Sequence, residues 1–149
     1  RAAWRPRAAC HGDVKFDNVL LGTAGGVAEP RLLLVDWELA GLGLPVWDLA
    51  GVVDGLVLHA LARGDGAALE ALARSAPALD AHRGACGGRL TPTPAELATA
   101  AVVRLTQTAI QLLASRHDQP GAAEAGWAVF DEARLLARQR AGRLLETMA

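Results

Sequence analysis

The sequence predicts an α+β fold, mainly α-helical, in which a short β segment is followed by a helical body. Two observations support this prediction. In the first 45 residues, short apolar runs alternate with clusters of turn-forming residues, which is typical of short strands. From residue 46 onward, apolar residues recur at three- and four-residue spacings, which is typical of amphipathic helices.

The β segment is expected to contain three short strands joined by turns. Residues 8–11 and 19–21 are two short apolar runs. Residues 31–36 form a continuous apolar run that begins after Pro30, and this pattern predicts a buried strand with Asp36 at its carboxyl end. We therefore expect the acidic side chains of this segment to lie on its connections, where catalytic residues are commonly found.

The helical body is expected to begin at Pro45, which suits the first turn of a helix that ends near Gly64. Thr93 and Glu96 form a capping-box pattern at the start of a helix that runs to about Ser115. The remaining spans are a short helix, an irregular connection and a last helix, expected at residues 67–74, 80–92 and 122–146.

Length, composition and charge limit the class of protein. The chain has 149 residues and is 52% hydrophobic, so we expect one domain, residues 1–149, with one substantial core. Fifteen basic and sixteen acidic side chains leave a net charge of −1, which predicts no nucleic-acid partner and no attraction to an anionic membrane. We find neither a signal peptide nor an uninterrupted apolar stretch of about 18 residues, so we expect a cytoplasmic protein.

The most informative motif is the run from His11 to Asn18, which reads His-Gly-Asp-Val-Lys-Phe-Asp-Asn. An apolar run later in the β segment ends in Asp36 followed by Trp and Glu. Phosphoryl transfer from a magnesium–nucleotide complex needs one carboxylate beside the attacking hydroxyl and further oxygen ligands for Mg²⁺. Asp13 suits the first task, and Asn18 and Asp36 suit the second. The sequence therefore predicts a phosphoryl-transfer site.

These residues resemble the catalytic loop of the aminoglycoside phosphotransferase and choline kinase family, which shares the protein-kinase fold. Residues 35–38 resemble that family's metal-binding segment, and residues 43–50 resemble the Gly-x-Pro-x-x-Asp-Leu-Ala stretch that follows it. The three matches occur in order and cover residues 9 to about 53. The resemblance implies the C-terminal lobe of a protein-kinase-like fold, in which residues 1–45 hold the catalytic and metal-binding loops and residues 46–149 form a helical subdomain.

The resemblance implies a role for each matching residue. Asp13 would orient and deprotonate the acceptor hydroxyl, while Asn18 and Asp36 would bind Mg²⁺ and, through it, ATP. His11 would anchor the loop by packing and hydrogen bonding. Asp48 would support the site by accepting hydrogen bonds from the loop backbone.

Lys15 and Glu38 bear on the acceptor and on the metal. Protein kinases usually have Lys two positions after the catalytic Asp, where its ammonium neutralises charge on the moving phosphoryl group, whereas many small-molecule kinases have His or another residue. Lys15 therefore favours a Ser or Thr hydroxyl of a peptide or protein, although a solvent-exposed lysine is an equally good interpretation. Glu38 is expected to bind a second Mg²⁺ directly or through water, with capping or ion pairing as the alternative.

The leading hypothesis is an ATP- and Mg²⁺-dependent phosphotransferase. The Trp37-Glu38 pair after Asp36, together with Lys15, resembles the kinases of ribosomal-peptide natural-product pathways, which implies a peptide substrate and a partner protein that binds the precursor peptide. One alternative is a kinase of aminoglycosides or other small alcohols. Another, from a different class, is a non-catalytic binding or scaffold module completed by a partner chain.

A complete kinase of this fold also needs a glycine-rich strand pair over the phosphates, a strand Lys and a helix Glu that pairs with it. None of these can be placed before residue 11. We therefore expect the N-terminal lobe to be absent from this chain, and we expect the fragment alone to be inactive.

Overall fold

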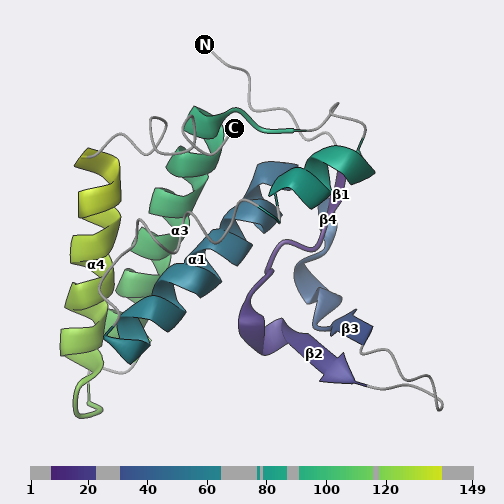
Figure 1. Ribbon diagram of the computed structural model, residues 1–149. Helices are drawn as coiled ribbons and strands as arrows, with labels where there is room; N and C mark the ends of the chain where they lie inside the picture. The colour runs from purple at the N-terminus through teal and green to yellow at the C-terminus, as the bar shows by residue number, and fades with distance from the viewer. Residues whose placement is uncertain are drawn as a thin grey trace.

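A computed structural model describes residues 8–22, 31–64, 77, 79–86, 91–115 and 118–138 of the chain. Within these residues a body of long helices lies beside a small set of antiparallel strands (Figure 1). This is the mainly helical α+β class that the sequence predicts.

Four short strands form two antiparallel pairs, namely β1 (Ala8–Cys10) with β4 (Gly41–Gly43) and β2 (Val19–Gly22) with β3 (Arg31–Leu34). Two single-turn 3₁₀ helices, η1 (Phe16–Asn18) and η2 (Trp37–Leu39), precede β2 and β4. The three predicted strands are therefore present. Strand β4 is not predicted from the sequence, because a Gly-Leu-Gly stretch has no strand pattern of its own and is held by pairing with β1.

Four of the five leucines of β2 and β3 are exposed and the fifth, Leu34, is partly buried, so the prediction that residues 31–36 form a buried strand is wrong. Leu32 and Leu33 keep 74% and 59% of their surface exposed, and Leu21 on the opposite strand keeps 71%. Among the described elements, β2 and β3 contact mainly each other. A continuous apolar run predicts burial only where another layer covers both faces of the strand.

Three long helices form the helical body, and their starts agree with the sequence signals. They are α1 (Pro45–Arg63), α3 (Pro94–Ser115) and α4 (Ala122–Arg138). Before α3, the Thr93 backbone N–H donates to Glu96 Oε2 (2.9 Å) and the Glu96 N–H donates to Thr93 Oγ1 (3.2 Å), which confirms the capping box. The helix predicted at residues 67–74 and the end of the last predicted helix lie outside the described residues.

Residues 79–85 are helical, which corrects the prediction of an irregular connection from residue 80. Leu79 packs against the core of the helical body. Partial burial of this side chain stabilises a helical turn that Gly84 disfavours on its own.

The core lies between α1, α3 and α4 and consists mostly of small apolar side chains. Leu97 and Leu105 of α3 and Val53 and Val57 of α1 are its largest fully buried members. By length and composition alone, α1 and residues 95–114 would also pass as membrane-spanning helices, a test that buried core helices meet as well. The α1 helix thus has one face in this core, and its N-terminal turns support the loop described next.

Candidate functional site

The loop of residues 11–18 is fixed to the start of α1 by a hydrogen-bond network around Asp48. The Asp48 carboxylate accepts hydrogen bonds from the backbone N–H groups of His11 (2.7 Å) and Gly12 (2.9 Å). The indole N–H of Trp47 donates to the Gly12 carbonyl (3.1 Å). Gly12 has φ 86°, a conformation that glycine adopts without strain. The first turn of α1 thus holds both the N–H and the carbonyl of Gly12.

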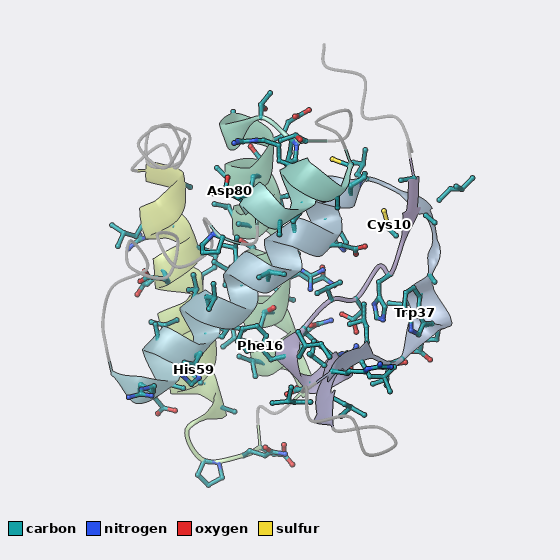
Figure 2. All side chains as sticks on the ribbon, turned by 45° about the vertical axis from the view of Figure 1, so that its right-hand side comes forward. Cys10, Phe16, Trp37, His59 and Asp80 are labelled. Atoms are coloured by element: carbon teal, nitrogen blue, oxygen red, sulfur yellow. The ribbon has the colours of Figure 1, made fainter. Side chains whose placement is uncertain are left out.

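His11 is buried under the loop and links it to the end of β3. Its Nε2 lies 2.9 Å from the Val35 carbonyl oxygen, and its Nδ1 accepts a hydrogen bond from the Asp13 backbone N–H (3.3 Å). The Trp37 ring, labelled in Figure 2, packs edge to face with the imidazole, and the two ring centroids lie 4.6 Å apart. One side chain therefore connects Asp13 with the residue that precedes Asp36.

Asp13 and Lys15 form a close ion pair at the surface of the loop. Lys15 Nζ lies 2.6 Å from Asp13 Oδ2, and the Lys15 side chain is half exposed. The hydrogen bond from Lys15 is the main cause that lowers the pKa of Asp13, with the charge of Arg104 as a smaller cause. The same hydrogen bond raises the pKa of Lys15, and the charges of Asp36 and Asp17 add to this. Asp13 is therefore ionised at neutral pH.

Asn18 is buried behind Asp13, and its amide is oriented by that residue. Its Nδ2 donates to the Asp13 backbone carbonyl (3.0 Å) and to Asp13 Oδ2 (3.3 Å). The Val35 backbone N–H donates to the Asn18 carbonyl (2.9 Å), so Asn18 lies beside the residue that precedes Asp36. Asp36 itself has φ 65° and ψ 62°, a left-handed conformation that Asp and Asn tolerate better than most residues.

The donor set of Asn18 and Asp36 fits a hard cation such as Mg²⁺, which prefers amide and carboxylate oxygens. Because Asn18 directs its Nδ2 toward Asp13, its Oδ1 is left without a protein donor among the described residues. The exposed Asp36 carboxylate is close enough to Lys15 to raise the pKa of that ammonium. Glu38 is exposed in η2, and no contact with Asn18 or Asp36 is found for it within the described residues.

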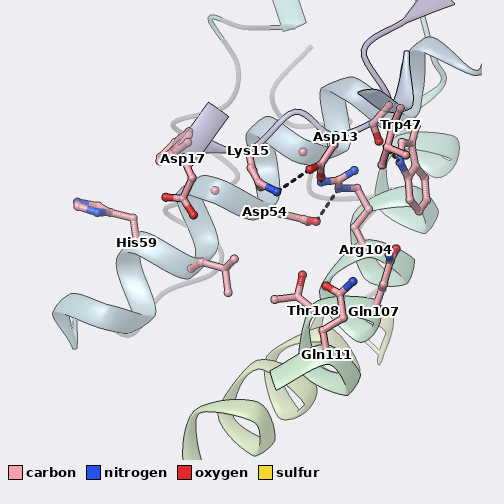
Figure 3. A pocket seen from close by; sticks show the side chains of 16 residues that line it. Asp13, Lys15, Asp17, Trp47, Asp54, His59, Arg104, Gln107, Thr108 and Gln111 are labelled. Atoms are coloured by element: carbon pink, nitrogen blue, oxygen red, sulfur yellow. Dashed lines mark hydrogen bonds and ion pairs between the residues drawn. The ribbon is translucent and has the colours of Figure 1, made fainter. Parts of the chain in front are cut away.

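A pocket of about 640 Å³ opens in front of Asp13 and Lys15, between the loop and helices α1 and α3 (Figure 3). Its α3 wall presents Gln107, Thr108 and Gln111. Within the described part of the chain these three side chains make no hydrogen bonds. A volume of this size is in the range of small-molecule sites, which use a few polar groups to orient their ligands.

An ion pair between Arg104 of α3 and Asp54 of α1 lies at the side of this pocket and is not among the sequence predictions. Arg104 Nε donates to Asp54 Oδ2 (3.1 Å), and its Nη2 donates to the Val14 carbonyl (3.1 Å). The same Nη2 lies 4.0 Å from Asp13 Oδ1, and the guanidinium lies over the Trp47 ring. The sequence signal was the position of two charged residues inside otherwise apolar helical patterns.

Burial dominates the electrostatics of Asp54. It raises the pKa of Asp54 to about 7, although the Arg104 charge and hydrogen bond act in the opposite direction. Its second oxygen, Oδ1, is buried and has no hydrogen-bond partner in the described part of the chain. Arg104 is therefore the one group among the described residues that stabilises the charged form of this carboxylate.

Two glycines of α1 provide the surface on which the loop rests. A Cβ atom on Gly51 would overlap the Val14 carbonyl oxygen, and one on Gly55 would lie 2.7 Å from the Phe16 ring. Residues four apart share one face of a helix, so the two glycines form a continuous seat for the residues on either side of Lys15. Glycine inside a helix costs about 1 kcal/mol relative to alanine, and here the close approach of the loop explains it.

Comparison with protein-family models matches residues 1–85 to a family described as the phosphotransferase enzyme family. We find no match among curated proteins or among solved structures. The matched range contains the loop, the Asp36 segment and α1. It does not include α3, so Arg104 and the polar wall of the pocket lie beyond it.

Proposed function

The chain belongs to the phosphotransferase enzyme family, and we propose that it is the C-terminal lobe of a kinase with a protein-kinase-like fold. In this proposal residues 1–45 hold the catalytic and metal-binding loops, residues 46–149 form the helical subdomain, and a further lobe covers the nucleotide. The observation that supports it best is the position of Asp13, an ionised carboxylate that faces a pocket and lies between Lys15 and Asn18.

The acceptor hydroxyl would bind in the pocket and donate a hydrogen bond to Asp13. Its oxygen forms a bond to the γ-phosphorus of ATP while the bond from that phosphorus to the leaving oxygen of ADP breaks, and the hydroxyl proton passes to Asp13. Because neighbouring cations lower the pKa of Asp13, the carboxylate is a weak base, and its main contribution is orientation. Lys15 would neutralise charge on the moving phosphoryl group.

Asn18 and Asp36 would hold Mg²⁺ through their free oxygens, with Glu38 as a ligand of a second ion. Bound in this way, the metal would neutralise charge on the nucleotide phosphates. His11 and Asp48 support this arrangement, because they fix the loop that separates Asp13 from the metal ligands.

Two acceptor classes remain as proposals, and different observations favour them. The size of the pocket and the side chains of Gln107, Thr108 and Gln111, which make no hydrogen bonds within the described residues, favour a small molecule with several hydroxyl groups. Lys15 favours a Ser or Thr hydroxyl of a peptide, as in ribosomal-peptide natural-product biosynthesis with a precursor-binding partner protein. The pocket supports the small alcohol more directly.

Substitution of Asp13 tests the function in the chain joined to its nucleotide-covering lobe. Asp13→Asn should lower the rate of ADP release with acceptor by about 10²–10⁴-fold, the usual contribution of a positioned acid–base group. Asp17→Asn is the matched control, because Asp17 lies on the same loop and lines the same pocket but does not contact Asp13. Near-normal turnover in Asp13→Asn would contradict the assignment.

Lys15→Ala tests the role of the ammonium. We expect it to lower kcat more than it raises the KM for ATP, since the charge acts on the transition state. The opposite pattern would make Lys15 a nucleotide-binding residue.

Thr108→Val separates the two acceptor classes. It should raise the KM for a small polyol such as myo-inositol and leave turnover of a serine-containing hexapeptide unchanged. Thr106→Val is the control, because the Thr106 hydroxyl already donates to the Val102 carbonyl (2.7 Å). Turnover of the hexapeptide alone, unaffected by either variant, would favour the peptide kinase.

A further inference from the structure

Arg104 is the side chain through which α3 reaches the loop. Its side chain is 12% exposed, and its guanidinium uses two different nitrogens, Nε toward Asp54 and Nη2 toward the Val14 carbonyl. The planar group also packs over the Trp47 ring, whose own N–H donates to the loop at Gly12. A guanidinium held at both ends and on one face has little freedom to move.

The Val14 carbonyl is held from two sides. On one side it rests against Gly51 of α1, where no side chain larger than hydrogen fits, and on the other it accepts the hydrogen bond from Arg104. Val14 follows Asp13 directly in the chain. The orientation of the peptide group between Val14 and Lys15 therefore limits where the Asp13 carboxylate can lie.

Arg104 is the one partner of the buried Asp54 carboxylate within the described residues. Asp54 Oδ2 accepts the hydrogen bond from Arg104 Nε, and Oδ1 has no partner among those residues. A buried ion pair of this kind contributes little to stability compared with apolar side chains of the same size. Its consequence here is geometric, because it orients the guanidinium toward the loop.

We propose that Arg104 is a positioning residue for phosphoryl transfer, which fixes the Asp13 carboxylate by holding the Val14 carbonyl against α1, with Asp54 as its anchor. The inference rests on the proposed function of Asp13. It places a determinant of the reaction on α3, outside the range that the family match covers.

Replacement of Arg104 should disturb the position of the loop more than it disturbs the fold. Arg104→Gln removes the bridge, so the Val14 carbonyl loses its donor. Arg104→Lys keeps the charge, but one ammonium cannot bond Asp54 and Val14 in the same geometry. We expect the lysine to loosen the loop as well.

Hydrogen exchange of the backbone amides in the full chain, followed by nuclear magnetic resonance, tests this directly. In Arg104→Gln, the backbone amide of Asn18, which donates to the Lys15 carbonyl (3.0 Å), should exchange faster. Leu105→Val is the control for a general loss of α3 packing, because Leu105 is fully buried and lies next to Arg104 in sequence. Arg134→Gln is the control for loss of an exposed arginine paired with Asp131.

The inference is overturned if Arg104→Gln leaves the Asn18 exchange unchanged, or if Leu105→Val changes it equally. In the chain joined to its nucleotide-covering lobe, Arg104→Gln should lower kcat by about 10²-fold, as expected for a misplaced catalytic group, with the KM for ATP nearly unchanged. Unchanged kcat would also overturn it. If the wild-type protein phosphorylates no acceptor, the proposed function fails, while the resonance experiment still decides whether Arg104 holds the loop.

Discussion

The loop region (residues 8–22 and 31–43) and the helical body (α1, α3 and α4) are held in place by different forces. In the loop region the buried side chains are Cys10, His11 and Asn18, and the leucines of its strands are exposed except Leu34, which is partly buried. In the helical body the buried side chains are nearly all apolar and pack helix against helix. The loop region therefore depends on a few directional hydrogen bonds to the body, while the body depends on many contacts without direction.

This difference separates stability from activity. Truncation of a side chain in the apolar core lowers the free energy of unfolding of the whole protein. Substitution of a residue in the contact between the loop region and the helical body changes the position of Asp13 while most of the core stays intact. Four substitutions test this separation, beginning with the largest expected effect.

Leu105→Ala should have the largest effect on stability. The side chain is fully buried in α3, and large-to-small changes at such positions lower the free energy of unfolding by about 2–5 kcal/mol. Urea unfolding followed by circular dichroism measures this. Ile110→Ala on the same helix is the control, because Ile110 is 58% exposed and its replacement should cost less than about 0.5 kcal/mol. Equal losses in the two variants would contradict an apolar core at Leu105.

Gly51→Ala should affect activity more than stability. Alanine is favoured over glycine inside a helix by about 1 kcal/mol, but its Cβ would overlap the Val14 carbonyl oxygen and push the loop away from α1. We expect a loss of kcat of about 10²-fold from the displaced Asp13. Gly84→Ala is the matched control, since a Cβ there meets no atom within 4 Å and activity should be unchanged. Full activity in Gly51→Ala would show that the seat is not needed.

Asp54→Asn should change how stability depends on pH. Burial raises the pKa of Asp54 from 3.8 to about 7, so the folded state binds a proton more tightly than the unfolded state. Its contribution to stability is full below pH 3.8 and is lost as the pH rises through about 7. The unfolding free energy of the wild type, minus that of the variant, should therefore fall between these limits and stay constant above them. A difference that does not vary with pH would contradict a buried Asp54.

Thr93→Ala should have the smallest effect, confined to the start of α3. It removes the hydroxyl that accepts the Glu96 N–H, and loss of such a cap costs about 1 kcal/mol. Thermal unfolding should show the decrease with kcat unchanged. Thr99→Ala, in the exposed part of the same helix, should be neutral or slightly stabilising because alanine is the better helix former. A loss of activity in Thr93→Ala would mean that the loop region depends on this end of α3.

Local signals in the sequence predicted much of the fold. Pro45 and the Thr93–Glu96 capping box mark helix starts that the structure has. Both signals are local, since a proline acts within the first turn and a capping box joins residues three positions apart. Local signals did not predict the exposure of residues 31–36, because burial of an apolar strand requires a covering layer. They also did not predict the helix at residues 79–85, where Leu79 packs against a core that is distant in the sequence.

The sequence by itself determined the chemical inventory of the site: Asp13, Lys15 and Asn18 lie on one short loop, and Asp36 follows a strand that returns beside it. Only the tertiary structure decided what holds that loop, since Arg104 is 50 residues from Asp54 and 90 residues from Val14. The physical reason is the distance along the chain over which each feature is determined. Short motifs are set by backbone geometry within a few residues, whereas a bridging arginine and a glycine seat exist only after α1 and α3 have packed together.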